Sequence, residues 1–131
     1  MTRPEQPTND RLPPEPEAKY LRLHDSLIDG FGGFSMNGRI IQANKALRDM
    51  IGYTGEELSE LTLLDLTPAK WHDFERRIIE EQVIPHGHSE IFEKEYRHKD
   101  GTVFPVEVRI SLVRDTDGQP AEMWAIIRDI T

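Results

Sequence analysis

The 131-residue chain contains no cysteine. This absence excludes disulfides, thiolate nucleophiles, cysteine-ligated metals and thioether-linked cofactors. No apolar run approaches the roughly 20 residues that a membrane-spanning helix needs, and the polar, proline-rich start lacks the pattern of a signal peptide. We therefore expect a cytoplasmic location and no membrane insertion in this segment.

Positive charge is also scarce. The chain has 16 lysines and arginines against 24 acidic residues, a formal net charge of -8. Such a surplus of negative charge argues against nucleic acid or an anionic membrane as a partner. Hydrophobic residues make up 37% of the chain, enough for the core of one domain of ordinary size.

Catalytic motifs are missing as well. We find no phosphate-cradling glycine loop and no activated nucleophile, so no catalytic residue is assigned and an enzyme is not expected from this chain alone. His86 and His88, with Glu90 nearby, have the chemistry of metal ligands. Their spacing is loose and they fall in a proline- and glycine-containing turn, so a polar loop is the preferred interpretation and no metal is expected.

The last third of the chain alternates apolar and polar residues with a period of two. Asp100-Gly101, after a strand over residues 89–97, predicts a two-residue hairpin turn because these residues tolerate positive φ angles. Residues 115–118 predict a second turn. Residues 121–129 are apolar on both faces, which is typical of a central strand. The strand between the two turns places five apolar side chains on one face: Phe104, Val106, Val108, Ile110 and Leu112.

The first third is predicted to hold a tail, a helix and a hairpin. Residues 1–14 are proline-rich and are interpreted as a disordered tail. Residues 15–30 form an amphipathic helix ended by Gly30. Asn37-Gly38 predicts a type I′ turn between strands 31–36 and 39–43. The apolar face of the helix carries Tyr20, Leu23 and Leu27.

The middle of the chain is predicted to be helical. Asn44 can cap a first helix, residues 54–57 form a capping box for a second, and residues 61–66 suggest a single turn. A longer helix opens at Thr67-Pro68 and is ended by Pro85 and Gly87. Its predicted inner face carries Trp71, Phe74 and Ile78.

Together these elements predict an α+β fold. A five-stranded antiparallel sheet has short helices and one longer helix crossing one of its faces. The space between the long helix and the sheet is either packed solid or holds a small ligand. Lys94 shares a strand face with Phe92 and Tyr96, so one polar group could point into this space. The candidate pocket residues are Trp71, Phe74, Ile78, Phe92, Tyr96, Val106, Val108 and Ile110.

Five segments, in this order and at these spacings, resemble a PAS domain of the bacterial sensory-box type. They are residues 25–30, 37–44, 51–58, 99–101 and 128–131. The resemblance implies that residues 31–131 form a sensory or dimerisation module upstream of an output domain, often a histidine kinase or a diguanylate cyclase. It also implies that the chain is a fragment ending at the output junction. Asp129 and Thr131 match the family's junction motif and would relay the signal.

The resemblance restricts the cofactor without naming it. Members that form a flavin photoadduct or carry a thioester-linked chromophore need a cysteine, and this chain has none. Haem-binding members place a histidine on the long middle helix, where this chain has His72. On a regular helix His72 lies about 100° from Trp71 and about 160° from Phe74. It is therefore expected to point away from the pocket, and haem is not favoured.

Two functions remain open from the sequence. The first is a module that binds a small ligand and relays occupancy to an output domain in the same polypeptide. The second is a ligand-free dimerisation module whose cavity is filled by side chains. A homodimer is expected in both cases. Trp124 and Ile126 share one face of the last strand, and that face needs a cover from the helix carrying Leu23 or from a second subunit.

Overall fold

A computed structural model describes residues 28–131 and contains one five-stranded antiparallel sheet in the order β2-β1-β5-β4-β3. The predicted α+β fold is confirmed. The predicted tail and nearly all of the predicted N-terminal helix, with Tyr20, Leu23 and Leu27, lie outside the described residues. Gly30, expected to end that helix, is instead the first residue of β1. The strands are β1 (Gly30–Ser35), β2 (Ile40–Ala43), β3 (Phe92–Arg97), β4 (Val103–Arg114) and β5 (Pro120–Asp129).

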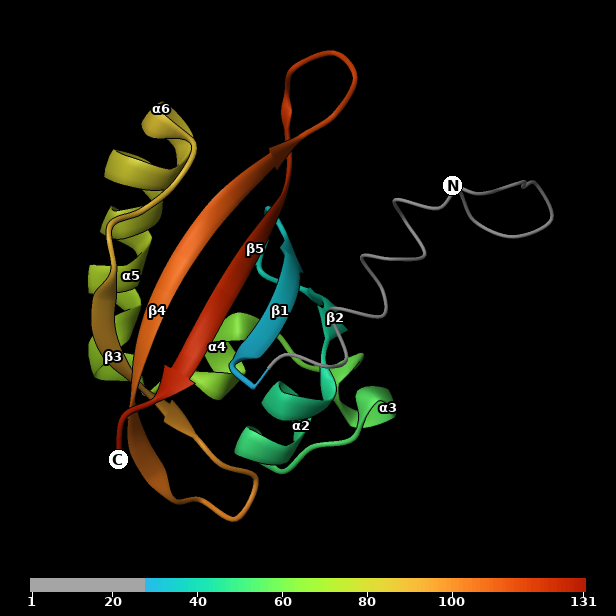
Figure 1. Ribbon diagram of the computed structural model, residues 1–131, viewed down its shortest axis with the longest axis vertical. Helices are drawn as coiled ribbons and strands as arrows, with labels where there is room; N and C mark the ends of the chain where they lie inside the picture. Colours follow the sequence, from blue (N-terminus) through green and yellow to red (C-terminus); the bar gives the residue numbers. More distant parts are fainter. Residues whose placement is uncertain (1–27) are drawn as a thin grey trace, which may run out of the picture.

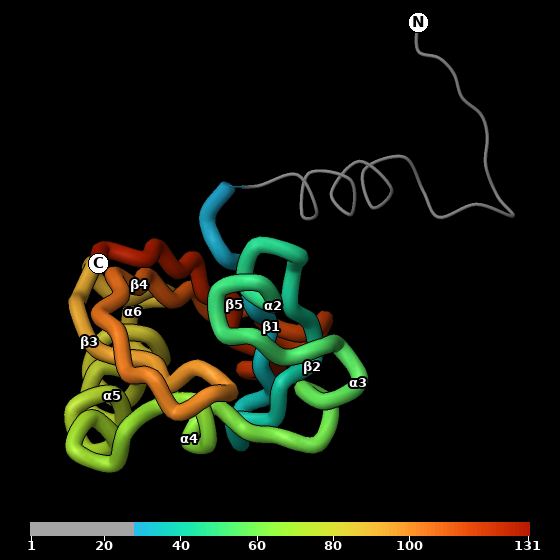
Figure 2. The backbone as a smooth tube through the Cα atoms, turned by 90° about the horizontal axis from the view of Figure 1, so that it is seen from below, coloured from blue at the N-terminus to red at the C-terminus, as the bar shows by residue number. Residues whose placement is uncertain are grey.

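The helices lie between β2 and β3 in the sequence and cover one face of the sheet (Figures 1 and 2). The first two pack near β1 and β2, and the long helical run lies along β3 and β4. The helices are α2 (Lys45–Ile51), α3 (Gly55–Leu58), α4 (Leu63–Leu66), η1 (Ala69–Trp71), α5 (His72–Ile78), η2 (Ile79–Val83) and α6 (Ile84–His86).

The hairpin turns differ from the prediction. Ser35 N–H donates to Arg39 O at 2.9 Å and Gly38 N–H donates to Ser35 O at 2.9 Å, so the first loop has three residues rather than two. Gly38 has a φ of 90°, whereas no residue other than glycine has a positive φ in the described chain. Asn37 therefore lacks the geometry of a type I′ turn, and the loop is a type I turn closed by a left-handed glycine.

The same loop recurs at the other two hairpins. Gly101 and Gly118 have φ angles of 94° and 80°. Each glycine N–H bonds to the carbonyl three residues earlier, to His98 O at 2.8 Å and to Asp115 O at 3.0 Å. The two-residue turn predicted at Asp100-Gly101 is thus also wrong, although both turns were located correctly.

The long helix continues through Pro85, contrary to the prediction. Residues 69–86 are helical without interruption, and Gly87, with a φ of 89°, ends the run. The turn before Pro85 is π-helical, and in it Ile84 N–H bonds to Ile79 O. In a regular α-helix a proline ring clashes with the carbonyl four residues earlier. A wider turn relieves that clash, which explains how the proline is accommodated.

The core lies between the sheet and the helices. Phe104, Val106, Val108 and Ile110 of β4 are all buried, as the alternating pattern predicts. Strand β5, apolar on both faces in the sequence, is the central strand of the sheet.

Asn44 joins this sheet to the first helix. Its side chain is fully buried, and its Oδ1 accepts hydrogen bonds from Leu47 N–H and from Phe31 N–H, both at 2.9 Å. Its Nδ2 donates to Asp29 O at 3.1 Å. One side chain therefore caps α2, as predicted, and also ties the helix to β1.

We expect Asn44→Ala to lower the free energy of unfolding by about 1–3 kcal/mol, because it removes a helix cap and a buried hydrogen bond to β1. Urea unfolding followed by circular dichroism measures the change. Asp49→Ala on the same helix is the control, since its ion pair with Lys45 is exposed and should contribute about 0.5 kcal/mol or less. Equal effects of the two substitutions would contradict the role assigned to Asn44.

Candidate functional site

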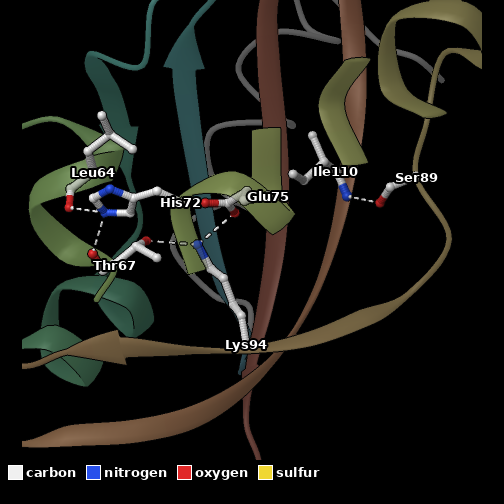
Figure 3. A network of polar contacts seen from close by, with 7 residues as sticks. All are labelled: Leu64, Thr67, His72, Glu75, Ser89, Lys94 and Ile110. Atoms are coloured by element: carbon white, nitrogen blue, oxygen red, sulfur yellow. Dashed lines mark hydrogen bonds and ion pairs between the residues drawn. The ribbon is translucent and has the colours of Figure 1, made fainter. Parts of the chain in front are cut away.

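A buried ion pair joins the long helix to strand β3. Lys94 and Glu75 are 1% and 3% exposed, and Lys94 Nζ lies 2.6 Å from Glu75 Oε2 (Figure 3). The orientation of Lys94 toward the helix, one of the sequence alternatives, is confirmed. The sequence analysis missed Glu75. It lies four residues after Trp71, within the apolar stripe of the helix, and a carboxylate in such a stripe is the signal that could have identified it.

The Lys94 ammonium makes two hydrogen bonds and one cation–π contact. It donates to Glu75 and to Thr67 Oγ1, the latter at 2.9 Å, and it lies 4.5 Å from the centre of the Tyr96 ring. Thr67 is itself buried. An ammonium has three protons to donate, so two hydrogen bonds and a cation–π contact use its capacity fully.

Burial perturbs the protonation of this cluster. Desolvation lowers the pKa of Lys94, and the charge of Glu75 and its hydrogen bond oppose that shift. Burial raises the pKa of the Tyr96 phenol far above its usual value, and the Glu75 charge adds to the effect. The Tyr96 phenol is therefore held neutral beside the ion pair.

The second oxygen of Glu75 is not bonded. Glu75 Oε1 is buried and has no hydrogen-bond partner among residues 28–131. Leaving such an acceptor without a donor costs about 1–3 kcal/mol, and buried polar atoms in native proteins are otherwise almost always paired. Because this oxygen is buried, a molecule the size of water reaches it only if neighbouring side chains move.

Two hollows adjoin Glu75. The first is an enclosed cavity of about 10 Å³, roughly the space of one water molecule. The second, which we call the outer groove, is open and measures about 620 Å³. Leu63, Glu75 and Met123 line both. The enclosed cavity is also lined by Phe34, Tyr96, Val108, Ile110 and Ala125. The outer groove is also lined by Met36, Asn37, Gly38, Leu64, Ala69, His72, Asp73, Arg76, Ile79, Glu80 and Ile84.

Three of the predicted pocket residues, Tyr96, Val108 and Ile110, line the enclosed cavity. Val106 is buried in the core, and Ile78 is half-buried against it. Neither residue lines either hollow.

The predicted aromatic residues form a separate stack. The rings of Trp71 and Phe74 meet edge to face at 5.7 Å, and those of Phe74 and Phe92 at 5.9 Å. Trp71 Nε1 donates to Glu95 Oε1 at 3.0 Å, and Lys70 reaches the same oxygen at 3.0 Å. Because the indole N–H finds its partner at the edge strand, Trp71 is held beside β3 and away from both hollows.

His72 binds backbone carbonyls. Its Nε2 lies 2.7 Å from Thr67 O and 3.2 Å from Leu64 O. Carbonyls only accept, so Nε2 must carry the proton. His72 was expected to point away from the pocket between helix and sheet; it is not among the residues of the enclosed cavity, and it lines the outer groove.

The opposite face of the sheet carries the predicted packing residues. Trp124 is half-buried and meets Phe31 edge to face at 5.6 Å, while Ile126 is 40% exposed. At the end of β5, Asp129 Oδ1 accepts hydrogen bonds from Thr131 N–H at 2.9 Å and from the Thr131 hydroxyl. The two predicted relay residues are therefore bonded to each other.

Residues 28–131 contain no group of three or more histidine, aspartate and glutamate side chains placed to hold a metal ion. Over the same residues, no helix is both long enough and apolar enough to cross a membrane.

A family model described as PAS domain matches residues 29–131, and the chain belongs to that family. A solved PAS domain from Colwellia psychrerythraea superimposes with a TM-score of 0.82 at 22% identity, covering 88% of this chain and 97% of that one.

Two curated relatives are multidomain signalling proteins by their names and lengths. The chain is 36% identical over 116 residues to the probable diguanylate cyclase DgcE of Escherichia coli, which covers 88% of this chain and 10% of that protein. It is 25% identical over 115 residues to the sensor histidine kinase TmoS of Ectopseudomonas mendocina, covering 88% and 12%. The chain thus spans about a tenth of the length of the curated relatives it matches.

Lys94→Met should destabilise the fold by about 3–5 kcal/mol, because it leaves the Glu75 carboxylate buried without a counter-charge. The double variant Lys94→Met/Glu75→Leu should recover most of that loss. Urea unfolding of the four proteins of this cycle gives the coupling free energy. Lys70→Met, which breaks an exposed pair, should cost about 1 kcal/mol or less. An additive cycle would rule out the coupling.

Tyr96 should resist ionisation in the folded protein. The chain has three tyrosines, and the raised pKa of Tyr96 predicts a phenol that ionises only when the protein unfolds at high pH. The unfolded chain releases this proton near the ordinary phenol pKa, so stability is lost as pH rises beyond about 10. Ultraviolet titration of wild type against Tyr96→Phe measures it. The expectation is wrong if wild type shows a tyrosine that ionises below the pH of unfolding and Tyr96→Phe lacks this step in the titration curve.

Proposed function

We propose that the chain is a sensory PAS module that binds a small molecule between its helices and sheet and relays occupancy to an output domain in the same polypeptide. The observation that carries the proposal is the outer groove, about 620 Å³ in volume. The buried Glu75 is among the residues that line it, and one oxygen of its carboxylate has no hydrogen-bond partner among residues 28–131. A hollow of 300–1,000 Å³ with apolar walls and a few polar groups is typical of small-molecule sites.

The proposed relay starts at the long helix. Glu75 on α5 is bonded to Lys94 on β3, so a ligand that shifts α5 must also displace β3 or break a buried ion pair. Strand β3 pairs with β4, and β4 pairs with the central strand β5. A ligand that favours one packing of α5 can therefore bias the end of β5 by a population shift.

Asp129 is the proposed exit point. A side-chain oxygen that accepts the N–H two residues later is the arrangement of a helix N-cap, and Asp129 accepts from Thr131 N–H in this way. Asp129 would thus start a helix leading to the output domain. The relatives' names point to a diguanylate cyclase or a histidine kinase as that output.

A second candidate is a ligand-free dimerisation module. It is favoured by the small size of the enclosed cavity, about 10 Å³, which means that side chains fill the interior of the fold. The partly exposed Ile126 on the opposite face of the sheet would then contribute to the contact between two subunits.

A thermal-shift screen of metabolites, with native mass spectrometry of the purified chain, separates the two functions. Sensing predicts a compound that adds about 2.7 kcal/mol of stability at a hundredfold excess over its Kd, or roughly ten degrees in Tm for a domain of this size. Failure of every compound, with a dimer that Trp124→Glu dissociates, would favour the dimerisation module instead.

Asp129→Ala should uncouple ligand from output. In a fusion to a diguanylate cyclase domain, cyclase activity of the variant should lose its ligand response while the ligand Kd stays within about twofold, because Asp129 lies far along the proposed relay from the groove. Asp117→Ala, the same change at an exposed position of the turn that precedes β5, serves as the matched control. A full response in Asp129→Ala would refute the proposed exit.

A further inference from the structure

The chain enters the sheet beside the place where it leaves it. Strand β1 begins at Gly30, and Gly30 pairs with Ile127 near the end of β5 (Figure 1). Asp29 therefore lies next to Arg128, which directly precedes the proposed exit residue Asp129. Two residues that are 99 positions apart in the sequence are thus neighbours at one end of the sheet.

An ion pair joins these two ends. Arg128 Nη2 lies 3.2 Å from Asp29 Oδ2, and Arg128 Nε lies 3.4 Å from Asp29 Oδ1. Two parallel contacts between a guanidinium and a carboxylate fix their orientation as well as their distance. The backbone carbonyl of Asp29 also accepts a hydrogen bond from the buried Asn44 Nδ2, at 3.1 Å. Asp29 is thus tied to α2 and to the last strand at once.

Arg128 has a second carboxylate on its other side. Glu107 on β4 lies directly opposite Arg128, on the side away from β1. Asp29, Glu107 and Arg128 line one hollow of about 210 Å³, which leaves the guanidinium room to turn. The hydrogen bond and charge of Asp29 raise the pKa of Arg128, and the charge of Glu107 adds to the effect.

The charges beyond Glu107 favour this second position. Glu107 also lies directly opposite Glu93 on β3, and like charges placed in this way repel each other. A guanidinium that turned from Asp29 to Glu107 would offset the repulsion. The side chains of this row are partly or fully exposed, and exposed ion pairs are weak. The two positions are therefore close in free energy, and a modest displacement selects between them.

We propose that Arg128 is a two-position element that couples the start of the domain to its exit. Bonded to Asp29, it holds the end of β5 against β1; bonded to Glu107, it releases the start of β1 and holds β5 against β4. A displacement of the chain before Asp29 reaches Asp129 through Arg128. This input does not pass through the outer groove and shares only its exit with the ligand relay.

Backbone amide NMR signals of the purified chain test the proposal without a ligand or an output domain. Asp29→Asn removes one partner of Arg128, and Glu107→Gln removes the other. Because the signals of Ile130 and Thr131 report the average over both positions, they should move in opposite directions from wild type in the two variants. We expect the ratio of the two positions to change by about 1.5-fold to fivefold in each variant.

Two arginine variants are the matched controls. Arg128→Gln should remove the opposite movements, because neither carboxylate then has a guanidinium to hold. Arg109→Gln makes the same change at an exposed arginine that lines the same hollow, and it should leave the movements in place. In a fusion to a diguanylate cyclase domain, Asp29→Asn and Glu107→Gln should change the ligand-free activity in opposite directions. A pair with a structural role alone would lower the activity in both.

Each contrary result counts against Arg128 and leaves the groove untouched. Signals that move in the same direction in Asp29→Asn and Glu107→Gln would overturn the proposal. Opposite movements that persist in Arg128→Gln would overturn it as well, because the guanidinium would not be their cause. Neither result bears on ligand binding or on the relay from the long helix.

Discussion

The structure depends on one buried ion pair. Among residues 28–131, Lys94 and Glu75 are the two charged side chains that are buried, and they come from the edge strand β3 and the long helix. A pair of this kind adds little net stability compared with a well-packed apolar pair, but removing one partner is costly. The pair defines one fixed contact between the two elements, because carboxylate, ammonium and Thr67 hydroxyl meet where α5 approaches β3.

This arrangement also determines how the interior is divided. The aromatic residues Trp71, Phe74 and Phe92 stack beside β3, whereas Glu75 lies at the wall between the enclosed cavity and the outer groove. The enclosed cavity is small, about 10 Å³, and the outer groove opens toward the β1–β2 hairpin. A ligand in that space would touch the helix directly and the central strand through Met123.

Patterns with a short range were predicted well from the sequence. The period-two alternation of β4, the apolar β5 and the Asn44 cap depend on neighbouring residues, and each was found where it was expected. The positions of the turns were predicted correctly, but their types were not. Asn-Gly and Asp-Gly occur in both two-residue and three-residue hairpin loops, and the register of the strands decides which loop forms. Three of the eight predicted pocket residues line the enclosed cavity. Trp71 does not, because its indole N–H is bonded to a residue 24 positions away.

The π-helical turn has a consequence for the inward face of the long helix. Glu75 and Val83 both point into the core, yet eight residues of a regular α-helix would leave them about 80° apart. A turn with i→i+5 bonding takes up one more residue than usual, so the eight residues span close to two whole turns. The helix therefore contains one residue more than a regular α-helix needs to place Glu75 and Val83 on the same face. Deleting one residue within 79–82 would restore regular α-helical bonding and leave Val83 seven residues after Glu75, within about 20° of the same face. It would also return the Pro85 ring to the clash that the wider turn relieves.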